Sequence, residues 1–441
     1  VEQDSYDAAR VYHKYKSKWE GKTVDVEKLS RDDRFEYEMW ARSKDEIIGD
    51  VNPMEVLQLR RMSKTMKLGD SVIRKELKKE EYNCKELNTY STSNSSAQKV
   101  KDILVSICKA NETEEITNQQ ILDQLEGDLN KMEAAEKAPV AYRDDVVKDN
   151  YADFNDRFYG NGNVQVSNKS ALHGTHVAGI IGAARNNGKG MDGIADNVQI
   201  MMLRAVPDGD EHDKDIALAI RYAADNGAKV INMSFGKGYS PEKSWVDDAV
   251  RYAESKGVLL IHAAGNDAKN IDSAKNYPSP VFMKDDKRAP NWITVGASGP
   301  NNEKPNSLTA NFSNYGKSEV DVFAPGVKIY ATVPGGNTYQ NLQGTSMASP
   351  VVAGIAALIL QYFPSLSAEQ VKYAIEKSSQ KLNVKVKDPG TGEEVSLADI
   401  SKFGGVVNAY EAVKLASTLK GERNKSNVKP VKSSVKPKVK S

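Results

Sequence analysis

The stretch VLLIHAAGN at residues 258–266 sets the fold class of the chain. Residues 258–264 form a largely apolar run of strand length, and Gly265-Asn266 end it at a turn. Amphipathic helical patterns occupy residues 213–226 and 244–256. Continuous apolar strands that alternate with helices predict an α/β fold with a buried parallel sheet, helices on both faces and right-handed crossovers. Other apolar runs of strand length lie at residues 198–206, 229–235, 292–297 and 320–323.

The 441 residues divide by composition into three zones. Residues 1–140 are rich in Lys, Glu, Leu and Met and poor in glycine, which predicts an all-helical module. Within it, Thr117 and Gln120 fit a capping box at the start of a helix. Residues 141–418 have frequent glycine and hold the α/β pattern, whereas residues 419–441 form a basic tail without periodicity that we expect to be disordered.

Composition and charge exclude several classes of protein. Hydrophobic residues make up 39% and charged residues 27% of the chain, as in an ordinary globular protein. The net charge of +1 does not demand a nucleic-acid partner, and no run of about 18 apolar residues predicts a membrane span. Two cysteines, Cys84 and Cys108, are compatible with a disulfide or with two thiols.

GTSMASP at residues 344–350 opens a strongly apolar helical pattern. Gly344 allows an unusual turn, and Ser346 stands at the predicted helix start. A serine at such a place most often caps the helix. Its small neighbours also favour a nucleophile, because the free N–H groups of a helix start can stabilise a negative oxygen beside the hydroxyl.

LHGTHVAG at residues 172–179 supplies a candidate base. His173 and His176 are three residues apart, whereas the zinc-protease signature places two histidines four residues apart with an adjacent glutamate. A pair of buried core histidines is the other interpretation, and the apolar residues after His176 fit it. His173 remains the candidate general base.

Asn266 follows the apolar run at residues 258–264 and stands at the turn that ends it. An asparagine at a strand end is most often a turn residue, and for Asn266 taken alone that interpretation is favoured. Its amide can instead donate to an oxyanion that forms during acyl transfer.

In this order, the three segments resemble those of the subtilisin-like serine peptidases, or subtilases. INMSFG at residues 231–236, similar to the family's substrate-binding strand, and GGVVNA at residues 404–409 extend the match. The resemblance spans roughly residues 150–415 and is strongest to secreted subtilases of the Bacteroidetes type, which carry a long helical insertion. It implies a subtilase catalytic domain at residues 141–418 and a helical insertion at residues 1–140.

The resemblance implies a serine endopeptidase that forms an acyl-enzyme. Ser346 would be the nucleophile and His173 the general base, later the acid for the leaving amine. Asn266 and the N–H of Ser346 would form the oxyanion hole, and His176 would be a supporting or core residue. The peptide substrate would add as a strand along one segment, beside a pocket wall of small residues. The strand is Ser234, Phe235 and Gly236, and the wall is Ala263, Ala264 and Gly265.

The aspartate that orients the base in this family is not identified in the sequence. It normally ends an apolar strand upstream of the histidine and is followed by Ser-Gly or Thr-Gly. Asp4 and Asp70 lack the strand and the glycine, and Val-Val follows Asp144 and Asp145. We expect the Asp strand upstream of Val1, with the helical zone inserted after it, so that the chain is a fragment or one piece of a cleaved enzyme. The other hypotheses are that Asp144 or Asp145 substitutes, or that the chain is a degenerate subtilase that binds peptides as a scaffold.

The resemblance also sets expectations for cofactors, partners and location. No cofactor is required; subtilases often bind structural calcium, but no ligand set follows from this sequence and no metal ligand is assigned. The expected partners are a polypeptide substrate and an upstream segment of the same precursor that supplies the aspartate. A secreted, cell-surface or periplasmic bacterial location is implied.

Overall fold

The computed structural model describes residues 4–423 apart from 50–51, 111–113, 115, 134–137, 166, 301–307 and 383. Backbone contacts divide the chain into two compact units. One unit comprises Val1–Lys148 with Pro207–Asp210, and the other comprises Asp149–Val206 with Glu211–Ser441. The predicted basic tail lies outside the described residues from residue 424 onward.

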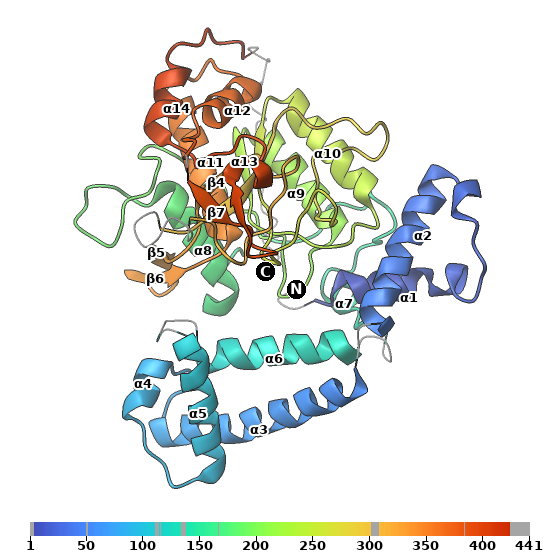
Figure 1. The fold of residues 1–441 in the computed structure, drawn as a ribbon, viewed down its shortest axis with the longest axis vertical. Helices are drawn as coiled ribbons and strands as arrows, with labels where there is room; N and C mark the ends of the chain where they lie inside the picture. The colour runs from blue at the N-terminus through green and yellow to red at the C-terminus, as the bar shows by residue number, and fades with distance from the viewer. Residues whose placement is uncertain are drawn as a thin grey trace, which may run out of the picture. The chain divides into compact units, whose positions relative to one another are not determined.

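The first unit is helical, as its composition predicts (blue to teal in Figure 1). The long helices α3, α5 and α6 share an apolar core with α4. The capping box that the sequence predicts is present, since the N–H of Gln120 donates to Thr117 Oγ1 at 3.3 Å and the N–H of Thr117 donates to Gln120 Oε1 at 2.9 Å. The elements are α1 (Asp7–Trp19), η1 (Val26–Lys28), α2 (Arg31–Lys44), η2 (Asp45–Gly49), α3 (Pro53–Leu77), α4 (Cys84–Thr89), α5 (Ser95–Ala110), α6 (Asn118–Glu133) and α7 (Tyr142–Val146).

A disulfide and a set of buried hydrogen bonds hold this helical core together. Cys84 and Cys108 form a disulfide, which the sequence had left open, and it joins the start of α4 to α5. The buried carboxylate of Asp70 on α3 accepts hydrogen bonds from Tyr82 Oη at 2.9 Å and from Asn118 Nδ2 at 2.7 Å. Since a buried carboxylate is costly without partners, these bonds fix α3 against the segments before α4 and at the start of α6.

The second unit (green to red in Figure 1) is built on a four-stranded parallel sheet in the order β1-β2-β3-β4. The strands correspond to four of the predicted apolar runs. Each pairs in register with the next; Leu260 of β2, for example, lies beside Ile231 of β1 and Trp292 of β3. The elements are β1 (Val230–Met233), β2 (Leu259–Ala263), β3 (Trp292–Ser298) and β4 (Val322–Pro325).

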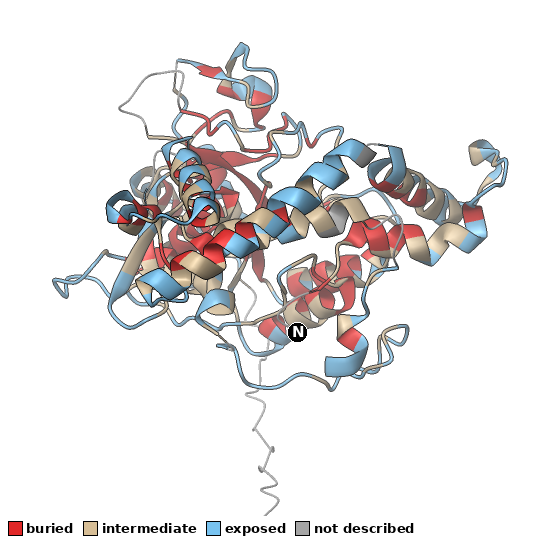
Figure 2. Cartoon of the chain, turned by 90° about the horizontal axis from the view of Figure 1, so that it is seen from below, coloured by how far each residue is buried: buried red, intermediate tan, exposed pale blue. Residues whose placement is uncertain are grey.

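Helices cover both faces of the sheet, as expected for buried parallel strands. One face packs on α11 (Thr345–Tyr362) and α12 (Ala368–Lys377), with Leu259 and Ile261 pointing into that core. The other packs on α9 (Asp213–Asp225) and α10 (Lys243–Ser255), with Leu260 pointing toward them. Strands β2 and β3 are buried throughout (red in Figure 2), so the predicted α/β fold with two helical layers is confirmed.

Residues 198–206 differ from the prediction. They form an apolar run of strand length but belong to no strand in the structure. Ile200, Met201 and Met202 are 44%, 41% and 38% exposed. Strand β1 pairs only with β2 within the described residues, so its other edge carries no strand. A strand needs a neighbour to satisfy its backbone groups, and residues 198–206 have none here.

Smaller elements complete the second unit. The hairpin of β5 (Ile329–Val333) and β6 (Thr338–Leu342) packs on α8 (Asn168–Gly182). Among the described helices, α11 alone is long and apolar enough to cross a membrane, but its apolar side chains contribute to the core of the sheet. The other elements are β7 (Lys385–Lys387), β8 (Glu394–Ser396), α13 (Leu397–Ile400) and α14 (Ala409–Ala416).

The disulfide between Cys84 and Cys108 is expected to stabilise the helical unit against unfolding. Replacing both cysteines, as Cys84→Ala with Cys108→Ala, opens a loop with a sequence separation of 24. Cross-linking a loop of that size stabilises by about 3 kcal/mol, mainly because it restricts the unfolded chain. Urea unfolding of the full chain, followed by circular dichroism, should show the helical unit destabilised by that amount. Reductant should shift the wild type to the same midpoint and leave the variant unchanged; a wild type that is insensitive to reductant contradicts the prediction.

Candidate active site

Helix α11 begins with a turn that only glycine accommodates well. Gly344 has φ of +148°, and its N–H donates to the carbonyl of Gly326 at 2.8 Å. A Cβ at this position would stand 3.4 Å from Asn266 Nδ2, an ordinary van der Waals contact, so the backbone conformation rather than the space around it favours glycine. Ser346 is therefore the second residue of α11 and is half-buried. Its N–H is one of the donors at a helix start that have no partner within the helix.

The side chain of Asn266 is fixed against this helix start. Its Oδ1 accepts hydrogen bonds from the N–H of Thr345 at 2.8 Å and from Thr345 Oγ1 at 2.9 Å. The N–H of Gly265 in turn donates to Thr345 Oγ1 at 3.1 Å. Because two donors point at Oδ1, the other end of the amide must be the NH₂ group. Within the described residues that NH₂ has no acceptor, and Asn266 is exposed. Two free donors, one side-chain and one backbone, thus lie at the turn that carries Ser346.

Ser234 lies against Ser346 from the end of β1. Ser234 Oγ donates to the carbonyl of Ser346 at 2.8 Å, and Asn232 Nδ2 donates to Ser234 Oγ at 2.9 Å. Asn232 is held by the hydroxyl of buried Ser349 at 2.7 Å. The hydroxyl of Ser346 itself makes only a long contact, 3.4 Å, to the carbonyl of Ser234. These hydrogen bonds fix the backbone of Ser346, whereas its hydroxyl stays available for a reaction.

His173 lies on α8, which packs against α11. Val177 on α8 and Met347 on α11 belong to one apolar cluster, and they stand one turn after His173 and directly after Ser346. The structure therefore brings the helix of His173 into contact with the helix of Ser346. No hydrogen bond joins His173 to Ser346, Asn266 or any carboxylate among the described residues.

His173 is exposed to solvent, yet desolvation by the protein atoms around its ring lowers its pKa below the usual value, and the nearby His176 lowers this pKa further. No carboxylate counteracts that effect. Asp144 and Asp145, the candidates for substitution, lie on α7 in the other unit and make no described contact with His173. A neutral imidazole is thus favoured, but nothing in the described residues fixes its tautomer.

His176 is a core residue. It is fully buried, and its Nε2 lies 3.0 Å from the carbonyl oxygens of both Ile329 and Gln340. Because both partners are acceptors, Nε2 carries the proton. The side chain therefore joins α8 to the β5–β6 hairpin. Within the described residues no group of three or more His, Cys, Asp or Glu side chains could hold a metal ion.

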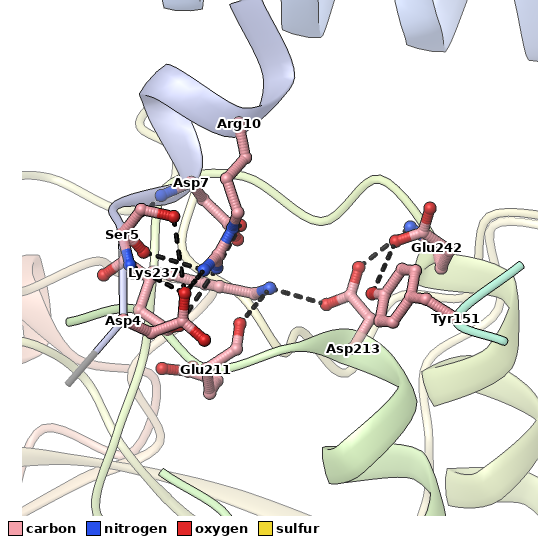
Figure 3. Close-up of polar contacts among 10 residues, drawn as sticks. Asp4, Ser5, Asp7, Arg10, Tyr151, Glu211, Asp213, Lys237 and Glu242 are labelled. Atoms are coloured by element: carbon pink, nitrogen blue, oxygen red, sulfur yellow. Dashed lines mark hydrogen bonds and ion pairs between the residues drawn. The ribbon is translucent and has the colours of Figure 1, made fainter. Parts of the chain in front are cut away.

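The segment after β1, Ser234–Lys237, is held from behind. Lys237 exchanges two backbone hydrogen bonds with Tyr277, at 2.8 and 2.9 Å. Its buried Nζ bonds to Asp213 Oδ1 and to the carbonyl of Glu211, both at 2.8 Å (Figure 3). Gly236 is exposed, and its N–H and C=O have no partner among the described residues. Free backbone groups on a fixed extended segment can accept another strand.

One polar residue of this region was not assigned a role from the sequence. His262, in the middle of β2, is buried, and its Nε2 lies 2.8 Å from the carbonyl of Phe235. Burial lowers its pKa to about 4, although the hydrogen bond to Phe235 partly opposes this effect. A histidine inside an apolar strand run is the signal that could have identified it, because such a residue needs a buried partner.

Known serine proteases are similar to this chain in sequence. A family profile described as the subtilase family matches residues 75–395. A thermophilic serine proteinase of Bacillus sp. (strain AK1) is 40% identical over 242 residues, which cover 55% of this chain and 52% of that protein. Thermitase of Thermoactinomyces vulgaris is 37% identical over 282 residues, which cover 63% of this chain and 88% of thermitase. A solved protease structure from Pseudoalteromonas arctica has 30% identity and a TM-score of 0.44, and the match covers 55% of this chain and 70% of that one.

The chain belongs to the subtilase family, a family of serine peptidases. The family profile matches more than half of its residues, and the match to thermitase covers most of that enzyme. The chain spans about half the length of the Bacillus proteinase.

The burial of His262 makes the stability of the second unit depend on pH. Its pKa is about 4 in the fold and about 6.5 in an unfolded chain, so the unfolded state binds more protons between these values. Stability should fall as the pH drops from 6.5 toward 4, with a contribution of about 3 kcal/mol from this residue. In His262→Gln, melting temperatures measured over that range should fall less steeply than in the wild type. Parallel curves for the two proteins would contradict the assignment.

Proposed function

We propose that the protein is a serine endopeptidase that cleaves peptide bonds through an acyl-enzyme. The observation that carries this proposal is the start of α11. There the half-buried Ser346 stands at a turn that also presents the NH₂ of Asn266 and the free backbone N–H of Ser346 itself. Such donors stabilise the negative oxygen of a tetrahedral intermediate.

The proposed reaction divides among three residues. His173, neutral because its pKa is lowered, takes the proton of Ser346 Oγ as the oxygen attacks the carbonyl carbon. The oxyanion receives hydrogen bonds from Asn266 Nδ2 and from the N–H of Ser346. The imidazolium then protonates the leaving amine, and water hydrolyses the ester by the same route. In subtilisin, loss of the asparagine donor costs roughly 10²–10³ in kcat.

The substrate backbone has a proposed docking strand. The N–H and C=O of Gly236 have no partner among the described residues, and the carbonyl of Ser234 has only the long contact to Ser346 Oγ, so an extended peptide can pair with these groups. Buried Ala263 and Ala264, with Gly265, form a wall of small side chains near Asn266. Their size favours an apolar or broad side-chain preference.

We also propose that a carboxylate from residues upstream of Val1 completes the site. Three observations support it: His173 has no carboxylate partner among the described residues, β1 has an open edge, and residues 200–202 expose three large apolar side chains. A parallel strand added to β1 would end at the same edge of the sheet as Ser234 and Asn266. Such a strand would deliver its last side chain close to the proposed nucleophile.

A location outside the cytoplasm is part of the proposal. The helical unit contains a disulfide, and such bonds persist mainly in oxidising compartments. The polypeptide substrate would accordingly be an extracellular or periplasmic protein.

The nucleophile assignment predicts selective labelling. A fluorophosphonate probe should label the full-length protein at one site, and Ser346→Ala should abolish both labelling and casein hydrolysis. The loss in kcat should be about 10⁶-fold, as it is when subtilisin loses its serine. Ser255→Ala, an exposed serine on α10, is the matched control and should react normally. Label that persists in Ser346→Ala would refute the assignment.

If an upstream carboxylate completes the site, a chain extended upstream of Val1 should hydrolyse peptides faster than the chain that begins at Val1. A chain extended upstream of Val1 should hydrolyse a peptide roughly 10⁴-fold faster than Val1–Ser441 alone, the scale of the aspartate's contribution in subtilisin. Activity requires a neutral base, so kcat/KM falls as the pH drops through the pKa of His173. That midpoint lies below 6.5 without the carboxylate, and a carboxylate beside the imidazolium should raise it. Equal rates and equal midpoints would count against the proposal.

The lack of a described carboxylate partner for His173 also favours a second candidate, a degenerate subtilase that binds peptides without cutting them. In that case even the extended chain would leave peptides intact, and Ser346→Ala would change only binding.

A further inference from the structure

His262 lies directly behind the proposed docking strand. Its ring sits among aromatic neighbours, with centroids 6.4 Å from Phe235 and 5.3 Å from Trp292. A Cβ built on Gly236 would stand 3.6 Å from its Nε2. In β2, Leu260 and His262 are two residues apart and share the face that packs on α9 and α10, where hydrophobic side chains are expected. An imidazole at this place is costly unless it is hydrogen-bonded.

The hydrogen bond of His262 replaces a missing sheet partner. Strand β1 ends at Met233, so the ladder to β2 does not hold the peptide groups that follow. Successive carbonyls of an extended segment point to opposite sides. The carbonyl of Ser234 faces Ser346 Oγ, and that of Phe235 faces the interior, where Nε2 of His262 donates to it at 2.8 Å. The imidazole therefore holds the inward-pointing carbonyl of Phe235, while the N–H and C=O of Gly236 have no partner among the described residues.

We infer that His262 is a positioning residue for peptide binding: by donating to the Phe235 carbonyl it holds Ser234–Gly236 extended and keeps the N–H and C=O of Gly236 directed at the substrate. The inference rests on the proposed function, because it assigns this segment to the substrate. His262 touches neither the substrate nor the reacting atoms. Burial lowers the pKa of His262 to about 4, so above that pH its ring is neutral and can donate through Nε2–H.

Two variants separate the hydrogen bond from mere packing. His262→Leu fills the space without a donor, and His262→Gln retains one. The first readout is the Kd of a fluorescent tetrapeptide, measured in a Ser346→Ala background so that cleavage does not interfere. The second is the rate at which a small sulfonyl fluoride, which does not extend along the strand, modifies Ser346. Ile293→Val, a trimmed core residue of β3 that lacks a side-chain hydrogen bond, is the matched control.

We expect His262→Leu to raise the Kd about tenfold, and the KM of the extended chain likewise, as the loss of one buried hydrogen bond would. The rate of sulfonyl fluoride modification and kcat should stay within about twofold, and His262→Gln should recover most of the affinity. Unchanged peptide affinity, or an equal loss in peptide binding and in probe reaction, would overturn the inference.

A different result would signal failure of the proposed function. If the wild type is not modified at Ser346 at all, the nucleophile assignment fails, whereas the peptide affinity still tests His262. Should His262→Leu not fold, hydrogen exchange at Nε2 in the wild type provides the test. Peptide binding should slow this exchange at least tenfold, because it holds the segment over the ring; no change would overturn the inference.

Discussion

The hydrogen bonds between the amide of Asn266 and Thr345 are the contact on which the arrangement of the site depends. They join the end of β2 to the start of α11, two segments 79 residues apart in sequence. Both donors go to Oδ1, which turns the NH₂ group outward. Because Gly344 adopts a φ of +148°, the chain can turn directly into α11 beside that amide, with Ser346 as the second residue of the helix. Without this contact the free donors of the helix start and of the amide would not share one turn.

Several polar groups of the second unit support the same edge of the sheet. The ends of parallel strands leave backbone groups without a ladder, and here side chains replace the ladder. Ser349, through Asn232 and Ser234, fixes the carbonyl of Ser346, while buried Lys237 joins the segment after β1 to the start of α9. Lys237 and Ser349 are costly to bury, and their hydrogen bonds to Asp213 and Asn232 offset that cost while they hold the elements that position the site.

Sequence reasoning went furthest where one periodicity dominated. The apolar runs at 229–235, 258–264, 292–297 and 320–323 predicted strands within a few residues, because buried parallel strands are apolar on both faces. The capping box at Thr117 could be predicted because it depends on local chemistry alone. Residues 198–206 carry the same apolar signal and form no strand, since a strand also depends on a neighbour, which no local pattern reports.

The site was less predictable than the fold for a related reason. The motifs indicated Ser346, His173 and Asn266, but the fixed orientation of the Asn266 amide comes from Thr345, whose part appears only when β2 and α11 meet. His262 lies within the apolar run at residues 258–264, yet its partner, the carbonyl of Phe235, lies 27 residues away in sequence. A side chain that bonds to a distant backbone carbonyl leaves no spacing to recognise. Under the proposed function, contacts of this kind hold the docking segment in place, so the features most closely tied to the proposed peptide binding are those that the sequence reveals least.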